Sequence, residues 1–194
     1  FGCCAAAIGG GYTSVMIDGS SLPVEENVEL TREVVKYAHA QGVSVEGELG
    51  VLAGVEDHVF AANSTYTNPM SAIEFFKKTG VDALAISYGT MHGASKGKDV
   101  KLRREIPTAI RECMNHEGIQ GALVSHGSST VPRYIVDEIN ALNGPVKLEF
   151  RYEDDTNVAD TAVSAYNALK DWAKDAPLVI YGTTTTAPCV AVSA

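Results

Sequence analysis

Four residues that can bind a metal ion follow four successive strand-like segments of the chain. They are Asp18, Glu48, His92 and His126, separated by 30, 44 and 34 residues. Each interval is about the length of one strand and one helix. Carboxylate and imidazole groups are common zinc ligands, and α/β proteins place their sites at the carboxyl ends of parallel strands. The spacing therefore predicts a metal site at that edge of a sheet.

The strand-like segment 43–49, VSVEGEL, brings two carboxylates to one of its faces. Val43, Val45 and Leu49 fall on one side of an extended chain, and Glu46 and Glu48 fall on the other. A glycine-punctuated loop with Glu56 follows. The alternative interpretation of this stretch is a polar strand end with a solvated acidic loop.

The two histidines of the set are each followed by glycine, in HGASKG from His92 and HGSST from His126. Glycine lets the backbone approach a ligand, and exposed N–H groups in such turns bind anions. Lys96 and Ser129 could add contacts to a phosphate. Two ordinary glycine turns remain the alternative, and neither segment matches a Walker A or dinucleotide-binding motif. His39 and His116 lie in helical patterns without such neighbours and are interpreted as structural.

Strand and helix patterns alternate along the whole chain. Strands are predicted over 12–17, 43–49, 82–87, 122–126, 146–150 and 177–182, and helices over 24–41, 68–80, 101–118, 130–144 and 157–175. Asn68, Pro69 and Gly80 are typical of helix ends. Pro107 should bend its helix or delay its start, and Thr130 is a plausible cap.

This alternation predicts one α/β domain over residues 1–194, with a parallel sheet and right-handed crossovers. A doubly wound sheet and a (β/α)8 barrel both fit the pattern. A complete barrel typically takes about 250 residues and eight strand–helix units. The chain, at 194 residues, is shorter.

Composition narrows the classes of partner. The net charge of −9 argues against a nucleic-acid surface, and no apolar run approaches the roughly 20 residues that span a bilayer. The four cysteines include no C-x-x-C pair, so a disulfide framework is not expected and a cytoplasmic location is. The apolar first residues lack a basic leader and are not interpreted as a signal peptide.

Three long stretches together resemble the class II, zinc-dependent ketose-bisphosphate aldolases, which include the fructose-bisphosphate aldolases. They are GYTSVMIDGSSLPVEENVELTREVVKYAHAQGVSVEGELGVLAGVED, DALAISYGTMHGASKG and LVSHGSSTVPRYIVDEINALNG. The resemblance covers residues 11–144 and leaves 145–194 as a divergent strand–helix–strand segment. It implies a TIM-type (β/α)8 barrel, here partial and with about six parallel strands, usually assembled as a homo-oligomer.

The resemblance also implies a reaction and roles for individual residues. Family members reversibly cleave a ketose bisphosphate, a small sugar phosphate, to dihydroxyacetone phosphate and an aldehyde, and zinc polarises the ketone. A monovalent cation is a second candidate cofactor. The implied zinc ligands are His92, His126 and Glu48, with Asp18 as a second-cation or substrate-side acid. Glu56 would be the acid/base, Glu46 a partner of the metal site, and Gly93, Lys96, Gly127 and Ser129 the phosphate cradle.

The sequence departs from the family at two motifs. The H-x-D-H motif, which supplies another zinc ligand and a proton-donating aspartate, does not occur, and neither does the N-I-D-T-D-type motif. These departures leave two alternatives to an active aldolase. One is a non-catalytic fragment or remnant of the barrel that acts in an assembly, and the other is a different zinc-dependent enzyme.

Overall fold

The structure, a computed structural model, describes most of the chain. The described residues are 1–52, 54–56, 59–61, 65–91, 101–127, 131–142, 147, 149, 151 and 158–174, with 54–56 and 59–61 described as backbone only. They form two compact units, Phe1–Gly54 with Ala61–Thr130, and Val55–Phe60 with Val131–Ala194. Each unit is described by itself, and the single domain over 1–194 stays a prediction.

The first unit contains a sheet of four parallel strands. These are β1 (Ser14–Ile17), β2 (Ser44–Leu49), β5 (Ala83–Ile86) and β6 (Ala122–Val124), in the order β1-β2-β5-β6. The register pairs Met16 with Glu46 and Glu48 with Ala85. Because the strands are parallel and follow one another as in the chain, their carboxyl ends share one edge of the sheet.

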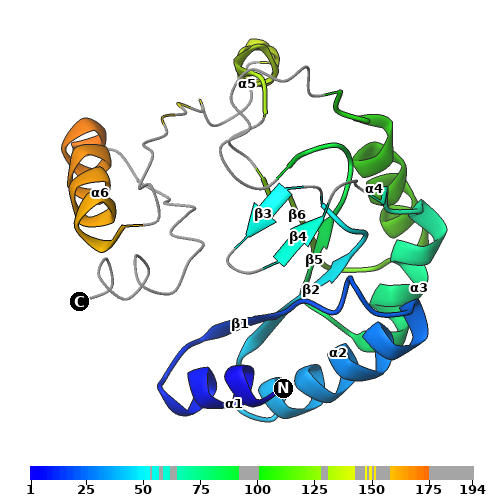
Figure 1. The fold of residues 1–194 in the computed structure, drawn as a ribbon. Helices are drawn as coiled ribbons and strands as arrows, with labels where there is room; N and C mark the ends of the chain where they lie inside the picture. Colours follow the sequence, from blue (N-terminus) through cyan, green and yellow to red (C-terminus); the bar gives the residue numbers. More distant parts are fainter. Residues whose placement is uncertain are drawn as a thin grey trace. The chain divides into compact units, whose positions relative to one another are not determined.

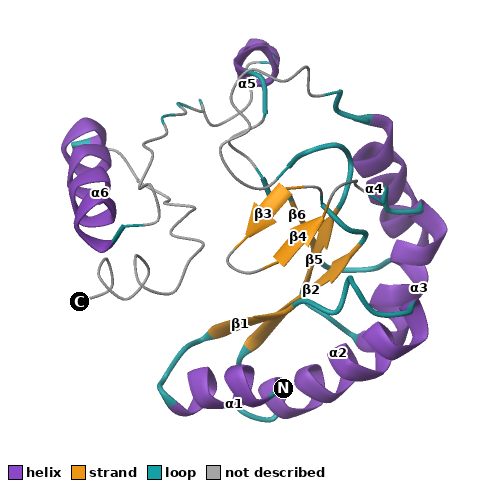
Figure 2. Ribbon diagram, viewed as in Figure 1, coloured by secondary structure: helices purple, strands orange, loops and turns teal. Residues whose placement is uncertain are grey.

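The helices of this unit lie along one face of the sheet (Figures 1 and 2). They are α1 (Gly2–Gly9), α2 (Val24–His39), α3 (Pro69–Thr79) and α4 (Glu105–Glu117), and each packs against the next. A doubly wound sheet carries helices on both faces, whereas a barrel carries them only outside. The one-sided arrangement therefore agrees with the predicted α/β fold of partial TIM-barrel type.

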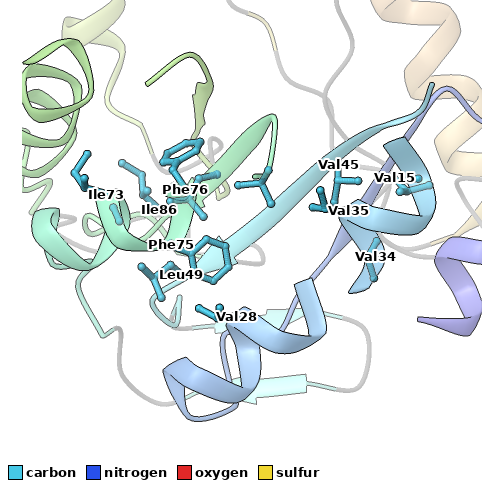
Figure 3. Close-up of a cluster of buried hydrophobic side chains, with 14 of the residues drawn as sticks. Val15, Val28, Val34, Val35, Val45, Leu49, Ile73, Phe75, Phe76 and Ile86 are labelled. Atoms are coloured by element: carbon cyan, nitrogen blue, oxygen red, sulfur yellow. The ribbon is translucent and has the colours of Figure 1, made fainter. Parts of the chain in front are cut away.

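The hydrophobic core lies between these helices and the sheet (Figure 3). Phe75 of α3 lies beside Leu49 of β2 there, and Val34 and Val35 of α2 lie near Val15 of β1 and Val45 of β2. Val43, Val45 and Leu49 are buried, as the strand alternation predicts. Since these side chains face the helices, Glu46 and Glu48 point to the opposite face of the sheet.

The helix ends follow the predicted signals where the structure describes them. The Asn68 side chain accepts hydrogen bonds from the N–H groups of Met70 (2.9 Å) and Ser71 (3.2 Å), and α3 ends at Gly80 in the left-handed conformation. Helix α4 begins at Glu105 rather than at residue 101. Pro107 thus lies in its first turn, where a missing N–H leaves no helical bond unmade.

Three short elements were not predicted from the sequence. Helix α1 contains no polar side chain except its cysteines, so it shows no amphipathic pattern beyond the buried pair Cys4 and Ile8. Strands β3 (Gly54–Glu56) and β4 (Val59–Ala61) pair with each other where a loop was expected. Such short strands depend on their partner rather than on local preference.

The second unit contains helices α5 (Arg133–Ala141) and α6 (Ala159–Ala173), which confirm two predicted helices with shorter bounds. The predicted cap Thr130 and the strand 177–182 lie outside the described residues. Of the predicted strand 146–150 only Lys147 and Glu149 are described, and neither is in a strand. No helix in the described part combines the length and apolar character required to cross a membrane.

Candidate metal site

The imidazole of His126 lies between the two inward-facing glutamates of β2. Its Nε2 atom is 2.8 Å from Oε1 of Glu46, and its Nδ1 atom is 3.4 Å from Oε2 of Glu48. The Glu48 residue is only 4% exposed, and the side chains of His126 and Glu46 are about one-fifth exposed, at 19% and 22%. The structure thus brings together two predicted metal ligands, Glu48 and His126, with Glu46, which was predicted as a partner of the metal site.

A small residue on β5, Ala85, allows His126 to reach the glutamates of β2. Strand β5 lies between β2 and β6 in the sheet, so His126 must reach across it. Ala85 pairs with Glu48 on one side and with Val124 on the other. Because Ala85 carries only a methyl group, the face of β5 leaves room for the ring to approach the β2 carboxylates.

The site favours positive charge. Burial alone lowers the pKa of His126, but the nearby carboxylates of Glu46 and Glu48 outweigh burial and raise the pKa to about 10. The two carboxylates around the half-buried imidazole make the site anionic. A bound cation would also neutralise their negative charge.

The geometry fits a zinc ion held by His126 and Glu48. Their 3.4 Å separation is longer than a good hydrogen bond. Two ligands at ordinary zinc distances in a tetrahedral site stand about 3.4 Å apart. The other ring nitrogen meets Glu46, and zinc-bound histidines ordinarily donate that N–H to a carboxylate or carbonyl. His126 and Glu48 therefore have the spacing of two ligands of a zinc ion, and the described side chains supply no third ligand.

Met91, the last described residue before His92, lies against Gly127, the residue after His126. A Cβ atom on Gly127 would lie 2.4 Å from the carbonyl oxygen and 2.8 Å from the nitrogen of Met91. Gly127 also has φ +65°, so both its backbone conformation and the close approach of Met91 favour glycine at this position. Hence the residue before His92 packs against the residue after His126. Nearby, the Tyr88 hydroxyl is 2.7 Å from Oγ of Ser125.

The remaining predicted site residues are not brought into this cluster by what the structure describes. Asp18 is exposed and accepts a hydrogen bond from the Ser20 N–H (2.8 Å). Four of these predicted residues lie outside the described residues: His92, Gly93, Lys96 and Ser129. Glu56 is described only by its backbone, which is in β3. Among the described side chains no group of three or more His, Cys, Asp or Glu has a metal-binding arrangement.

Two buried polar residues at this site were not predicted. Asn27 of α2 and Thr67, before α3, each bond a main-chain carbonyl at the end of β2. The available signal was the position of Asn27 and Thr31 on the same helical stripe as Val34, Val35 and Ala38. Polar residues at core positions of a helix must find partners inside the protein.

A one-sided (β/α) unit that gathers polar side chains at the carboxyl ends of its strands is typical of the TIM-barrel class of α/β folds. The sequence model of the family described as "Fructose-bisphosphate aldolase class-II" matches residues 1–186. The chain therefore belongs to the class-II fructose-bisphosphate aldolase family. The match extends beyond residues 11–144, so 145–186 are also part of the family sequence.

Individual relatives agree with this assignment. The chain is 45% identical over 181 residues to a fructose-bisphosphate aldolase of Treponema pallidum (strain Nichols), which covers 87% of the chain and 54% of the relative. It is 48% identical over 138 residues to that of Giardia intestinalis, which covers 71% of the chain and 42% of the relative. The chain thus spans about half the length of the curated relatives that it matches.

Solved structures show the same fold. The YdjI aldolase from Escherichia coli K12 is 29% identical with a TM-score of 0.57, over 88% of this chain and 55% of that one. The fructose-bisphosphate aldolase from Campylobacter jejuni is 25% identical with a TM-score of 0.52, over 84% and 48%. Both support the α/β barrel-type assignment.

Proposed function

We propose that this chain carries the metal-binding part of a class II aldolase, which reversibly cleaves a ketose bisphosphate to dihydroxyacetone phosphate and an aldehyde. Fructose 1,6-bisphosphate is the first substrate to test, because the matched relatives are named fructose-bisphosphate aldolases. The observation that carries the proposal is His126 held between Glu46 and Glu48 at the carboxyl edge of the sheet.

In this proposal His126 and Glu48 bind zinc together with His92. The backbone contact between Met91 and Gly127 supports the inclusion of His92, since it brings the residue before His92 to the residue after His126. Glu46 holds Nε2 of His126 and so fixes the direction of the ring. Zinc, when bound, would act as a Lewis acid on the substrate carbonyl.

The substrate contacts come from the two loops and the acidic loop. The family resemblance assigns the phosphate to the glycine turns at Gly93 and Gly127, with side-chain contacts from Lys96 and Ser129. Glu56 transfers the proton at the carbon of dihydroxyacetone phosphate. Asp18, exposed beyond β1, serves as the acid near a second, monovalent cation or the substrate.

The proposal is tested first by zinc binding to the purified chain. His126→Ala removes one ligand and leaves Glu48 buried, so we expect the dissociation constant to rise at least about 100-fold. Competition with a chromophoric chelator measures it. His116→Ala is the matched control, because His116 is exposed on α4 and should leave zinc binding unchanged.

Cleavage of fructose 1,6-bisphosphate, with zinc and with a chelator, then separates the possible activities. Chelator-sensitive cleavage supports the aldolase. Zinc binding without cleavage makes the chain a metal-binding part that acts in an assembly, and metal-dependent phosphate release without cleavage indicates another zinc enzyme. Stoichiometric zinc retained by the His92→Ala/His126→Ala double variant would show that the site lies elsewhere.

A further inference from the structure

The carboxyl end of β2 is held by side chains from both sides. We propose that Asn27 and Thr67 are positioning residues of the metal site, which fix the main chain at Glu48 and Leu49 and thereby the direction of the Glu48 carboxylate. The inference rests on the proposed zinc-binding role of Glu48. It concerns residues that bond the backbone and contact neither metal nor substrate.

Asn27 fixes the first of these two carbonyls. Its Nδ2 donates to the main-chain oxygen of Glu48 at 2.8 Å, and its Oδ1 accepts from the Thr31 hydroxyl at 3.1 Å. Asn27 and Thr31 are 1% and 0% exposed. Both hydrogen-bonding groups of the amide are therefore used inside the protein, and its orientation is determined.

Asn27 also contacts the segment that follows β1. A Cβ atom on Gly19 would lie 2.4 Å from Oδ1 and 2.9 Å from Cγ of Asn27. Only glycine allows the backbone to pass this closely. The same amide thus contacts the residue after Asp18 and bonds the carbonyl of Glu48.

Thr67 fixes the second carbonyl and joins it to β5. Its hydroxyl donates to the main-chain oxygen of Leu49 and accepts from the N–H of Ser87 at 2.8 Å. The Thr67 N–H donates to the Ser87 carbonyl at 2.9 Å, and Oγ of Ser87 donates to the carbonyl of Val51 at 3.2 Å. Thr67 is 3% exposed. The hydroxyl is thus the bridge between the residues that end β2 and the residue that follows β5.

The location of these bonds gives them a function beyond stability. The β1–β2 register ends at Gly47 and the β2–β5 register at Leu49, so the carboxyl end of β2 lies where the regular pairing runs out. A rotation of the backbone there would turn the Glu48 side chain away from His126. Ligand geometry tolerates little displacement, since metal–ligand distances are defined to within about 0.2 Å.

Thr67 offers a sharp test because the chain contains a chemically matched threonine away from the site. Thr79, 4% exposed, donates to the carbonyl of Phe75 (2.6 Å) and accepts from the N–H of Val81 (3.3 Å), at the end of α3. We compare Thr67→Val, Thr67→Ser, Thr79→Val and Asn27→Leu in the full chain. The zinc dissociation constant is measured by chelator competition, and the midpoint of thermal unfolding is measured without metal.

We expect Thr67→Val and Asn27→Leu to weaken zinc binding about tenfold or more, as outer contacts of metal sites do. Thr67→Ser keeps the hydroxyl and should bind like the wild type. Thr79→Val should lower the unfolding midpoint but keep the wild-type zinc affinity. This pattern would show that zinc affinity falls because the Glu48 carboxylate is displaced, and not because the protein is less stable.

Two results would contradict the inference, and they are distinguishable. If the wild type binds zinc, His126→Ala does not, and folded Thr67→Val and Asn27→Leu bind as well as the wild type, the positioning role is wrong while the metal site stands. The same holds if Thr79→Val weakens zinc binding as much as Thr67→Val. If the folded wild type binds no zinc, the proposed site itself is wrong and this inference falls with it.

Discussion

Glu46 and Glu48 meet the same imidazole but at different nitrogen atoms. Glu46 lies at Nε2 within hydrogen-bond distance, and Glu48 lies at Nδ1 at the longer separation of 3.4 Å. A carboxylate at one nitrogen fixes which tautomer and which ring orientation a metal-binding histidine adopts. In the proposed metal site the two glutamates would therefore contribute differently, with Glu48 as a ligand and Glu46 as the group that orients His126.

Glu46→Gln tests this division of roles. The amide keeps a polar group at Nε2 but removes the negative charge, so zinc affinity should fall about tenfold or more. Zinc titration in competition with a chelator measures the change. Glu29→Gln is the control, since Glu29 is exposed on α2 beside Arg32. Equal affinities of all three proteins would show that Glu46 does not support the ligand.

The residue types at the site could be predicted only in part. The alternation of strand side chains placed Glu46 and Glu48 together, and the repeated strand–helix interval placed His126 at the same edge. Sequence patterns did not identify Asn27 and Thr67, because their partners are main-chain carbonyls 21 and 18 residues away. A carbonyl is present at every position, so no residue type reveals such a bond.

At the scale of elements, Asp82 connects α2, β2 and β5 at the amino end of the sheet. Its Oδ2 accepts a hydrogen bond from the Val45 N–H (2.7 Å). The same oxygen lies 2.9 Å from Nε2 of His39, at the end of α2. Partial burial raises the pKa of Asp82, but the bonds from His39 and Val45 more than offset this and lower the pKa below its ordinary value of 3.8. The ionised carboxylate thus stabilises the junction of α2, β2 and β5.

Asp82→Ala should lower the free energy of unfolding by about 1 kcal/mol at neutral pH, a modest figure because the pair is partly exposed. A group with a lowered folded pKa stabilises the protein above its unfolded pKa, and this contribution is lost as pH falls through the folded pKa. Urea unfolding at pH 7 and at about pH 3 should therefore show a difference from wild type that shrinks in acid.

Glu117→Gln is the comparison for that experiment. Glu117 accepts a hydrogen bond from Lys77 at 2.8 Å, but on an exposed surface where such pairs contribute little. If Asp82→Ala changed stability no more than Glu117→Gln, or by the same amount at both pH values, the carboxylate of Asp82 would not be holding the junction.

At the scale of elements, sequence patterns predicted the helices and strands with long apolar periods or clear end signals. They missed α1, which has no polar face, and the short pair β3 and β4, which depends on a partner strand. The side of the sheet that the helices cover could not be chosen from local sequence either, because both a doubly wound sheet and a barrel alternate strands and helices. The strand order and the packing of α1 to α4 on one another decide it.

At the scale of the whole molecule, burial differs between the two compact units. The core cluster of the described residues belongs entirely to the first unit, whereas α5 buries none of its side chains and α6 buries Ala162. Tyr134, Ile139 and Leu142 are exposed apolar residues in or beside α5. Local stability should therefore be unequal along the chain.

Hydrogen exchange of the purified chain measures this difference. Amides of α2 and α3 should be protected far longer than those of α5, because opening α5 exposes little apolar surface. The measurement is repeated over a range of protein concentrations. Protection of α5 equal to that of α3 at every concentration would contradict the expectation, and protection that rises with concentration would indicate the expected homo-oligomer.

The strand order β1-β2-β5-β6 has a consequence for how the chain folds while it is being synthesised. Each strand of this sheet pairs with the one before it in the sequence, so its partner has already left the ribosome when it emerges. Helices α2, α3 and α4 likewise each pack on the helix before them. The strand pairings of the sheet can therefore form in the order in which its strands are synthesised. The proposed metal site, which needs the residues of β2 and the residue that follows β6, can form only after β6 has been synthesised.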